Sequence, residues 1–213
     1  MSQDTSRVDW YFDPISPFAY LQWPKVRALA ETRPVRLVPI LLAALLGHHG
    51  QKGPAEIPGK RLFTYRHVTW LAAREGRPLV LPPAHPFNPL AALRLVIAAG
   101  GTPGVVGTVL DWVWAEGRAA DDAAALAPLG ARLGLPDVAA AIAAPGVKDQ
   151  LRANTEAAIA AGVFGVPTLA VDGELFWGND AFEFAMDVLR DPALLASPAM
   201  ARLADLPEGA RRA

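Results

Sequence analysis

The sequence of 213 residues contains no cysteine. This absence excludes disulfides, thiolate metal ligands, a cysteine nucleophile and dithiol redox chemistry within the chain. A thiol that takes part in its chemistry must therefore arrive on a small molecule. The four histidines lack the paired spacing with carboxylates that metal ligands show, and we expect no metal site.

An excess of charge of one sign is also lacking, because 20 basic residues stand against 21 acidic ones. Such a balance predicts no general attraction to nucleic acid or to an acidic membrane. The longest apolar run, 89–110, is interrupted by an arginine, a glycine pair and a proline, which excludes a membrane span. The first seven residues lack the apolar segment of a signal peptide, so we expect a cytoplasmic protein.

The stretch around Ser16 reads D-W-Y-F-D-P-I-S-P-F from Asp9 onward. Its first half alternates in the way of a short, aromatic-rich strand, which Pro14 ends. Ser16 is the natural N-cap of a following helix, with Pro17 at the first helical position. A strand that runs into a helix N-terminus leaves unpaired N–H groups at one spot, which suits an anion. An isolated Ser-Pro pair, by contrast, would indicate only a helix start.

The next segments predict a β-α-β unit followed by helices. A helix over 18–32 and an apolar strand over 35–40 complete the unit. The stretch 47–61 is rich in glycine and proline and predicts a loop. Helices separated by Gly and Pro are expected throughout 62–145, with their tryptophans in the core: Trp70, Trp112 and Trp114.

After a further helix the pattern returns to strands. Two short apolar runs, 168–171 and 174–177, flank an Asp-Gly pair that predicts a type I′ hairpin. A last helix over 181–189 follows, with Asn179 or Asp180 as its expected cap. The order β-α-β, helices, β-β-α predicts an α/β thioredoxin-like fold. Residues 1–61 and 146–213 would form the thioredoxin-like domain, and 62–145 an all-helical insertion domain.

Three motifs carry a resemblance to a known family. They are Y-F-D-x-x-S-P-F-x-Y-L from Tyr11, G-V-F-G-V-P-T around Gly165, and W-G-N-D at 177–180. In this order they resemble the DsbA-related family, and within it the 2-hydroxychromene-2-carboxylate isomerases and the kappa-class glutathione transferases. The resemblance spans nearly the whole chain. Ser-Pro-Phe-Ala from Ser16 stands where redox relatives carry Cys-x-x-Cys, so disulfide exchange is excluded while a thiol-handling pocket is expected to remain.

The resemblance implies glutathione as the cofactor and Ser16 as the catalytic residue, whose hydroxyl hydrogen-bonds the glutathione sulfur. Lowering the thiol pKa from about 8.5 by two units needs about 2.7 kcal/mol. A helix N-terminus supplies about 0.3–2 kcal/mol, and a hydroxyl that donates to a charged sulfur about 1.5–3 kcal/mol. No general base is then required. A hydrolase-type serine nucleophile is the weaker interpretation, because no motif sets a His/Asp partner for Ser16.

The resemblance also implies the remaining glutathione contacts. Val166-Pro167 matches the family's cis-proline, and Val166 would hold the cysteinyl portion through its backbone like an added strand. Asp180 would meet the γ-glutamyl ammonium. The cofactor-binding residues are therefore expected to be Ser16, Pro17, Val166, Pro167, Trp177, Gly178, Asn179 and Asp180.

A carboxylated aromatic substrate is expected on the other side of the site. Four basic residues stand against one acidic residue between 47 and 66, which suits a carboxylate but fits a solvated loop equally well. The resemblance implies substrate contacts from this loop and from 87–88, namely Gln51, Lys52, Lys60, Phe87 and Asn88. On residue type alone, Asn88 is a helix cap.

The activity implied by the resemblance is a glutathione-dependent cis–trans isomerisation of the 2-hydroxychromene-2-carboxylate type, in aromatic catabolism. The thiolate would add reversibly to a conjugated carbon of the substrate, allow rotation and be eliminated again. One alternative is a kappa-like transferase, which would consume glutathione. Another is a non-catalytic, glutathione-binding or chaperone-like member of the fold. Relatives lead us to expect a homodimer.

Overall fold

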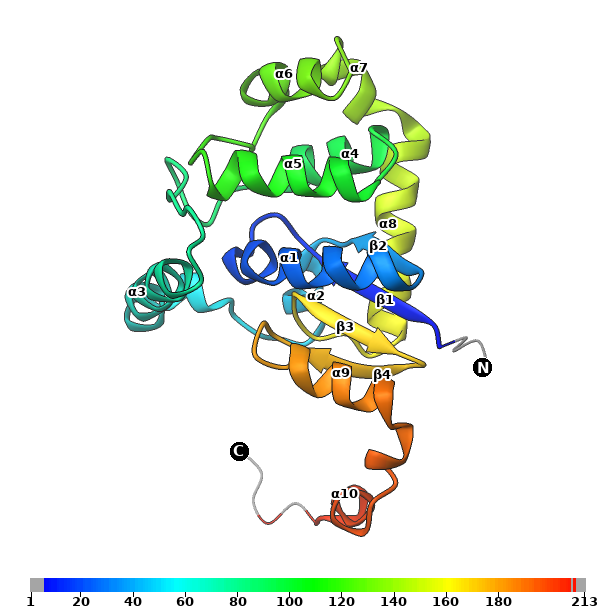
Figure 1. Cartoon of the computed structure of the whole chain (residues 1–213). Helices are drawn as coiled ribbons and strands as arrows, with labels where there is room; N and C mark the ends of the chain where they lie inside the picture. Colours follow the sequence, from blue (N-terminus) through cyan, green and yellow to red (C-terminus); the bar gives the residue numbers. More distant parts are fainter. Residues whose placement is uncertain (1–5, 208, 210–213) are drawn as a thin grey trace.

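The computed structural model describes residues 6–207 and 209, and it is built around a four-stranded mixed sheet (Figure 1). Strand β1 (Val8–Phe12) is central and runs parallel to β2 (Val35–Pro39). On its other side it pairs antiparallel with β3 (Thr168–Val171), which pairs antiparallel with β4 (Glu174–Trp177). The strand order β2-β1-β3-β4 is the arrangement expected from the β-α-β and β-β-α units.

Both faces of the sheet are covered by helices. Alternate side chains of β1 point to opposite faces, so they enter two different cores. Trp10 and Phe12 stack at 4.6 Å between ring centroids and enter the larger core, which helices α1 (Pro17–Thr32) and α9 (Phe182–Arg190) share. Tyr11 enters a smaller core under helices α2 (Leu42–His48) and α8 (Pro145–Ala160). All five residues of β1 are buried, so the strand that leads to Ser16 is held from both sides.

The helices agree closely with the sequence pattern, and the two hairpin strands occupy the predicted residues. In chain order the helices are α1 (Pro17–Thr32), α2 (Leu42–His48), α3 (Pro58–Arg74), α4 (Leu90–Ala98), α5 (Pro103–Trp114), α6 (Ala123–Arg132), α7 (Val138–Ala143), α8 (Pro145–Ala160), α9 (Phe182–Arg190) and α10 (Pro198–Ala201). Three short 3-10 turns, η1 (Pro54–Glu56), η2 (Pro192–Leu194) and η3 (Arg202–Asp205), complete the set. We refer to α3–α7, residues 58–143, as the helical segment.

Three local predictions are wrong. Residues 58–61 are the first turn of α3 and not loop, since Pro58 occupies a position in which a helix needs no N–H donor. The N-cap of α9 is Ala181 without a side-chain bond, so neither Asn179 nor Asp180 caps this helix. Trp70 is not a core residue but is 54% exposed on the outer face of α3, whereas Trp112 and Trp114 are buried as predicted.

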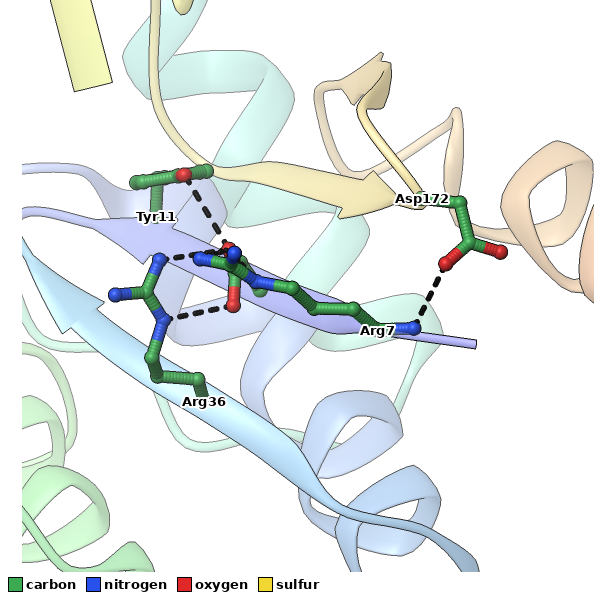
Figure 2. A network of polar contacts seen from close by, with 5 residues as sticks. Arg7, Tyr11, Arg36 and Asp172 are labelled. Atoms are coloured by element: carbon green, nitrogen blue, oxygen red, sulfur yellow. Dashed lines mark hydrogen bonds and ion pairs between the residues drawn. The ribbon is translucent and has the colours of Figure 1, made fainter. Parts of the chain in front are cut away.

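The hairpin between β3 and β4 has the predicted turn, with positive φ at both Asp172 and Gly173. At the opposite end of β1 from Ser16, Asp9 binds two arginines, Arg7 and Arg36, which Figure 2 labels. Arg36 reaches both Asp9 carboxylate oxygens at 2.7–2.8 Å, and Arg7 lies at 2.9 Å. Burial disfavours the charged form of Asp9, but the two guanidinium groups outweigh it and lower its pKa. This network ties β1 to β2.

In the part of the chain that the structure describes, no helix is both long enough and apolar enough to cross a membrane.

Candidate functional site

The three motifs meet at one end of the sheet. Because β3 runs antiparallel to β1, with Tyr11 opposite Thr168, the loop before β3 lies beside the loop that follows β1. Because β4 runs antiparallel to β3, with Thr168 opposite Trp177, the loop after β4 lies there too. The topology therefore brings the Ser16 turn, the Val166-Pro167 bond and the W-G-N-D segment together, although Ser16 and Asp180 are 164 residues apart in the chain.

Ser16 is the N-cap of α1, as predicted. Its hydroxyl accepts a hydrogen bond from the Ala19 N–H at 3.3 Å, and Pro17 occupies the first turn. Within the described residues no acceptor takes the hydroxyl hydrogen of Ser16, which leaves that hydrogen available for a ligand. Ser16 is only 6% exposed, so a ligand there would be partly shielded from water.

Asp13 organises the turn that precedes Ser16. Its Oδ1 accepts from the Ile15 N–H at 3.0 Å, and its backbone carbonyl accepts from the Ser16 N–H at 3.0 Å. Its Oδ2 accepts from the N–H of Leu42, the first residue of α2. The N-cap residue of α2 makes no side-chain hydrogen bond of its own. Burial raises the pKa of Asp13 to about 7, although the Ile15 and Leu42 N–H groups act in the opposite direction.

The Val166-Pro167 peptide bond is cis, as the family resemblance implied. Val166 is buried, and within the described residues no hydrogen bond engages its backbone N–H or C=O. The Pro167 carbonyl accepts from the Gly178 N–H at 2.9 Å. The backbone of Val166 is therefore free to pair with an extended ligand, while its neighbour anchors the W-G-N-D segment.

A buried glutamine joins two of the motifs. The Oε1 of Gln22 accepts from the Trp10 indole N–H at 2.7 Å, and its Nε2 donates to the Gly178 carbonyl at 2.8 Å. Gln22 has no exposed surface, so both ends of its amide need such partners. The first strand, the first helix and the W-G-N-D segment are thus fixed to one another.

Asn179 carries an unsatisfied polar atom. Its side chain is 9% exposed, and its Oδ1 is buried with no hydrogen-bond partner in the described part of the chain. Gly178 has φ +97°, a backbone conformation that favours glycine. Asp180 itself is exposed. A ligand that donates a hydrogen bond would satisfy Asn179.

Trp177 forms an exposed outer wall beside this point. Its indole packs edge-on against Phe164, with ring centroids 5.5 Å apart. A Cβ on Gly165 would lie 2.4 Å from the Trp177 Nε1, so glycine is required where the indole covers the backbone. Trp177 therefore lies over the segment that leads to the cis bond.

The predicted substrate-side residues are dispersed and mostly exposed. The side chains of Gln51, Lys52 and Lys60 are exposed, and within the described residues they make no hydrogen bond or ion pair. Asn88 accepts from the Leu90 N–H at 3.1 Å, but the N-cap of α4 is Pro89, so Asn88 precedes the cap position predicted for it. Phe87 packs against the larger core. Their predicted contacts with a substrate remain predictions.

Sequence reasoning missed a cluster around His85. Its Nε2 lies 2.8 Å from the Ile15 carbonyl, and its Nδ1 lies 2.8 Å from the Tyr65 hydroxyl. Arg61 donates to the Tyr65 hydroxyl at 3.1 Å and to the His85 carbonyl at 2.8 Å. Burial lowers the pKa of His85; the Ile15 bond opposes that shift, and the nearby charge of Arg61 reinforces it. Arg61 and Tyr65 also line a surface pocket of about 350 Å³.

Comparisons with known proteins show the family and the fold of the chain. The family model of the DSBA-like thioredoxin domain matches residues 7–190. A 2-hydroxychromene-2-carboxylate isomerase from Pseudomonas putida is 32% identical, covering 81% of this chain and 89% of the relative. A solved structure of a 2-hydroxychromene-2-carboxylate isomerase superposes with a TM-score of 0.74 at 27% identity, covering 94% of this chain and 99% of that one. These matches confirm the thioredoxin-like fold class with its helical insertion; the domain boundaries at 61 and 146 remain a prediction.

A more local similarity relates the chain to glutathione transferases. Glutathione S-transferase kappa 1 from Caenorhabditis elegans is 31% identical over 36% of this chain and 35% of the relative.

Proposed function

The chain belongs to the DSBA-like thioredoxin family and, within it, to the 2-hydroxychromene-2-carboxylate isomerases, and from this membership we propose that it is a glutathione-dependent cis–trans isomerase. The single observation that carries the cofactor assignment is the buried Asn179 Oδ1, which lacks a partner within the described residues. The Ser16 hydroxyl hydrogen, which has no acceptor there, supports it. A γ-glutamyl ammonium and a thiolate would satisfy the two groups.

The chain's own residues would hold glutathione in three ways. The Val166 backbone would pair with the cysteinyl portion as an added strand. Asn179 and Asp180 would receive the γ-glutamyl ammonium, beside the wall formed by Trp177. The Ser16 hydroxyl and the N-terminus of α1 would meet the sulfur. Bound glutathione would supply a thiolate that adds to the conjugated double bond of the substrate, so that the bond can rotate before elimination.

Ser16 would act by donating its hydroxyl hydrogen to the charged form of the thiol. A buried donor favours the ionised sulfur because the interaction is not screened by water. Together with the helix N-terminus it would lower the thiol pKa by about two units. Ser16 needs no base for this task.

A kappa-like transferase is the second candidate, supported by the local similarity to the Caenorhabditis elegans protein. Both activities would use the same thiolate, but a transferase consumes glutathione and an isomerase recycles it. A non-catalytic glutathione-binding protein is the third candidate. The proposal also includes a homodimer, which rests on the relatives, and a cytoplasmic location, where reduced glutathione is abundant.

The test measures glutathione binding by calorimetry and ionisation of the bound thiol by ultraviolet absorbance, in wild type, Ser16→Ala and Thr102→Ala. Thr102 is a matched control, because it caps α5 through the Val105 N–H just as Ser16 caps α1. Wild type and Thr102→Ala should bind and ionise the thiol. Ser16→Ala should bind it but leave it protonated, and turn over 2-hydroxychromene-2-carboxylate about 100-fold or more slowly.

Three outcomes would contradict the proposal. If wild type does not bind glutathione, both enzyme candidates fail. If both capping variants lose thiol ionisation equally, the effect belongs to helix capping and not to the Ser16 hydroxyl. If glutathione is consumed in proportion to the product, the transferase replaces the isomerase.

A further inference from the structure

The two peptide groups that precede Ser16 are each held at both ends. Asp13 holds one end of each, through the N–H groups of Ile15 and Ser16. The carbonyl ends are held by ring N–H groups from the helical segment. Trp114 Nε1 donates to the Pro14 carbonyl at 2.8 Å, and His85 Nε2 meets the Ile15 carbonyl at 2.8 Å. The turn therefore depends on residues 70–100 positions away in the chain.

The protonation of His85 follows from its partners. A carbonyl oxygen can only accept, so the hydrogen of a neutral His85 ring is on Nε2. Its Nδ1 is then an acceptor that faces the Tyr65 hydroxyl. This hydroxyl lies 2.8 Å from both that nitrogen and the His85 carbonyl, and its oxygen accepts from Arg61. The edges of the Trp114 and Tyr65 rings pack against the imidazole at 5.3 and 5.5 Å between centroids. The ring orientation is therefore set by packing as well as by hydrogen bonds.

We propose that His85 and Trp114 are positioning residues, which fix the Ser16 turn so that the Ser16 hydroxyl and the α1 N-terminus face the sulfur of bound glutathione. The inference rests on the proposed function, because the sulfur is the group that responds. Neither residue is assigned contact with a ligand. Both belong to the helical segment, so this segment takes part in thiol activation and not only in shaping the substrate pocket.

Two physical effects support this role. Holding both ends of a peptide group fixes its plane, and the two planes together fix the direction in which α1 starts. The carbonyl oxygens of Pro14 and Ile15 also carry partial negative charge directly before Ser16. A ring N–H on each oxygen offsets that charge, which would otherwise disfavour a thiolate nearby.

The simpler interpretation is that the two rings only attach the helical segment to the sheet. Trp112 separates the two interpretations. It is also buried on α5, and its Nε1 also donates to a backbone carbonyl, at 2.9 Å, but that carbonyl belongs to Ala119 within the helical segment. Replacing either tryptophan by Phe removes one N–H and a similar volume, and only one of the two touches the Ser16 turn.

The experiment compares four variants of the full chain: His85→Phe, His85→Gln, Trp114→Phe and Trp112→Phe. The pKa of bound glutathione is followed by ultraviolet absorbance, together with glutathione affinity and the midpoint of denaturant unfolding. We expect His85→Phe and Trp114→Phe to raise the bound-thiol pKa by about one unit, a roughly tenfold loss of ionisation at fixed pH. His85→Gln, which keeps an N–H near the position of Nε2, should restore most of the loss. Trp112→Phe should lower the unfolding midpoint and leave the pKa unchanged.

The outcomes separate this inference from the function on which it rests. If wild type ionises glutathione and no variant changes the pKa, the positioning role is rejected and the proposed function stands. If Trp112→Phe shifts the pKa as much as Trp114→Phe does, the effect is general destabilisation and the inference is also rejected. If wild type neither binds nor ionises glutathione, both fall. Should His85→Phe fail to fold, Trp114→Phe and His85→Gln still decide the question.

Discussion

The two sides of the candidate site are built differently. On the Ser16 side the polar groups are buried, and Asp13, Gln22, His85 and Trp114 bind them through specific hydrogen bonds. The side that carries the predicted substrate residues is open. Lys52 and Lys60 are exposed, and helix α3, to which Lys60 belongs, displays aromatic rings to solvent, with Phe63 67% and Trp70 54% exposed.

The difference fits the proposed function. A thiol is activated by a few kcal/mol of local electrostatics, and such interactions are strong only where water is excluded and the groups are held in place. Burial in turn demands a partner for each polar group, which restricts the residues that fit. Recognition by exposed cations has no such requirement. We therefore expect the Ser16 side to tolerate few substitutions and the open side many.

The largest effect should come from Asp13. Its folded-state pKa of about 7 lies above the value of about 3.8 for an unburied aspartate, so the folded state binds more protons than the unfolded state between these pH values. The contribution of Asp13 to the free energy of unfolding should therefore fall as pH rises from about 4 to 7, by up to about 4 kcal/mol.

Denaturant unfolding of wild type and Asp13→Asn at several pH values measures this effect. Subtracting the two free energies of unfolding at each pH cancels the contributions of the other titrating groups. Wild type should lose stability relative to the variant across the window, and a constant difference would refute the prediction.

A smaller effect is expected from Asn179→Leu. If Asn179 binds the γ-glutamyl ammonium as proposed, removing it should weaken glutathione binding by about 1.5–3 kcal/mol, or roughly 10-fold to 150-fold. The free protein should not lose stability, because the substitution also removes a buried oxygen that lacks a partner within the described residues. Calorimetry tests the loss of glutathione affinity, and denaturant unfolding of the same samples tests the unchanged stability. Lost stability with unchanged affinity would assign Asn179 a structural role only.

The open side should respond more weakly. Lys60→Ala and Lys52→Ala should each raise KM for a carboxylated substrate by no more than about fivefold, since exposed ion pairs contribute about 1 kcal/mol or less. Glutathione affinity and thiol ionisation should not change. Steady-state kinetics at low and high salt check this, because screening should reduce the difference from wild type. A large fall in kcat would contradict this prediction, because it would show that the lysines act in the chemical step and not only in substrate binding.

The smallest effect is expected from Trp70→Ala. Because the indole is exposed, the free energy of unfolding should change by no more than about 0.5 kcal/mol. The matched variant Trp112→Ala removes a buried indole from α5 and should cost about 3–5 kcal/mol. Unfolding curves of the two variants make the comparison. Equal losses would mean that α3 is covered in solution by another surface.

Much of this structure can be predicted from local rules in the sequence. Ser-Pro marks the start of α1, and Asp-Gly marks the hairpin, because each pair fits a particular backbone conformation. The cis bond at Pro167 was expected only through the family resemblance. The contact of His85 with the turn before Ser16 could not be predicted, since His85 and Ile15 are 70 residues apart in the chain and meet only in the folded protein. The exposure of Trp70 could not be predicted either, because a helical pattern does not tell which aromatic side chain is left uncovered by other elements.

The bridging amide of Gln22 gives this pocket a built-in reporter for solution work. One Gln22 amide hydrogen is committed to the Gly178 carbonyl, while the amide oxygen is committed to the indole of Trp10. The two side-chain NH₂ resonances should therefore be widely separated in an NMR spectrum and should exchange slowly with solvent. Their collapse toward the values of a free glutamine would show that the W-G-N-D segment has left α1, with no label added to the protein.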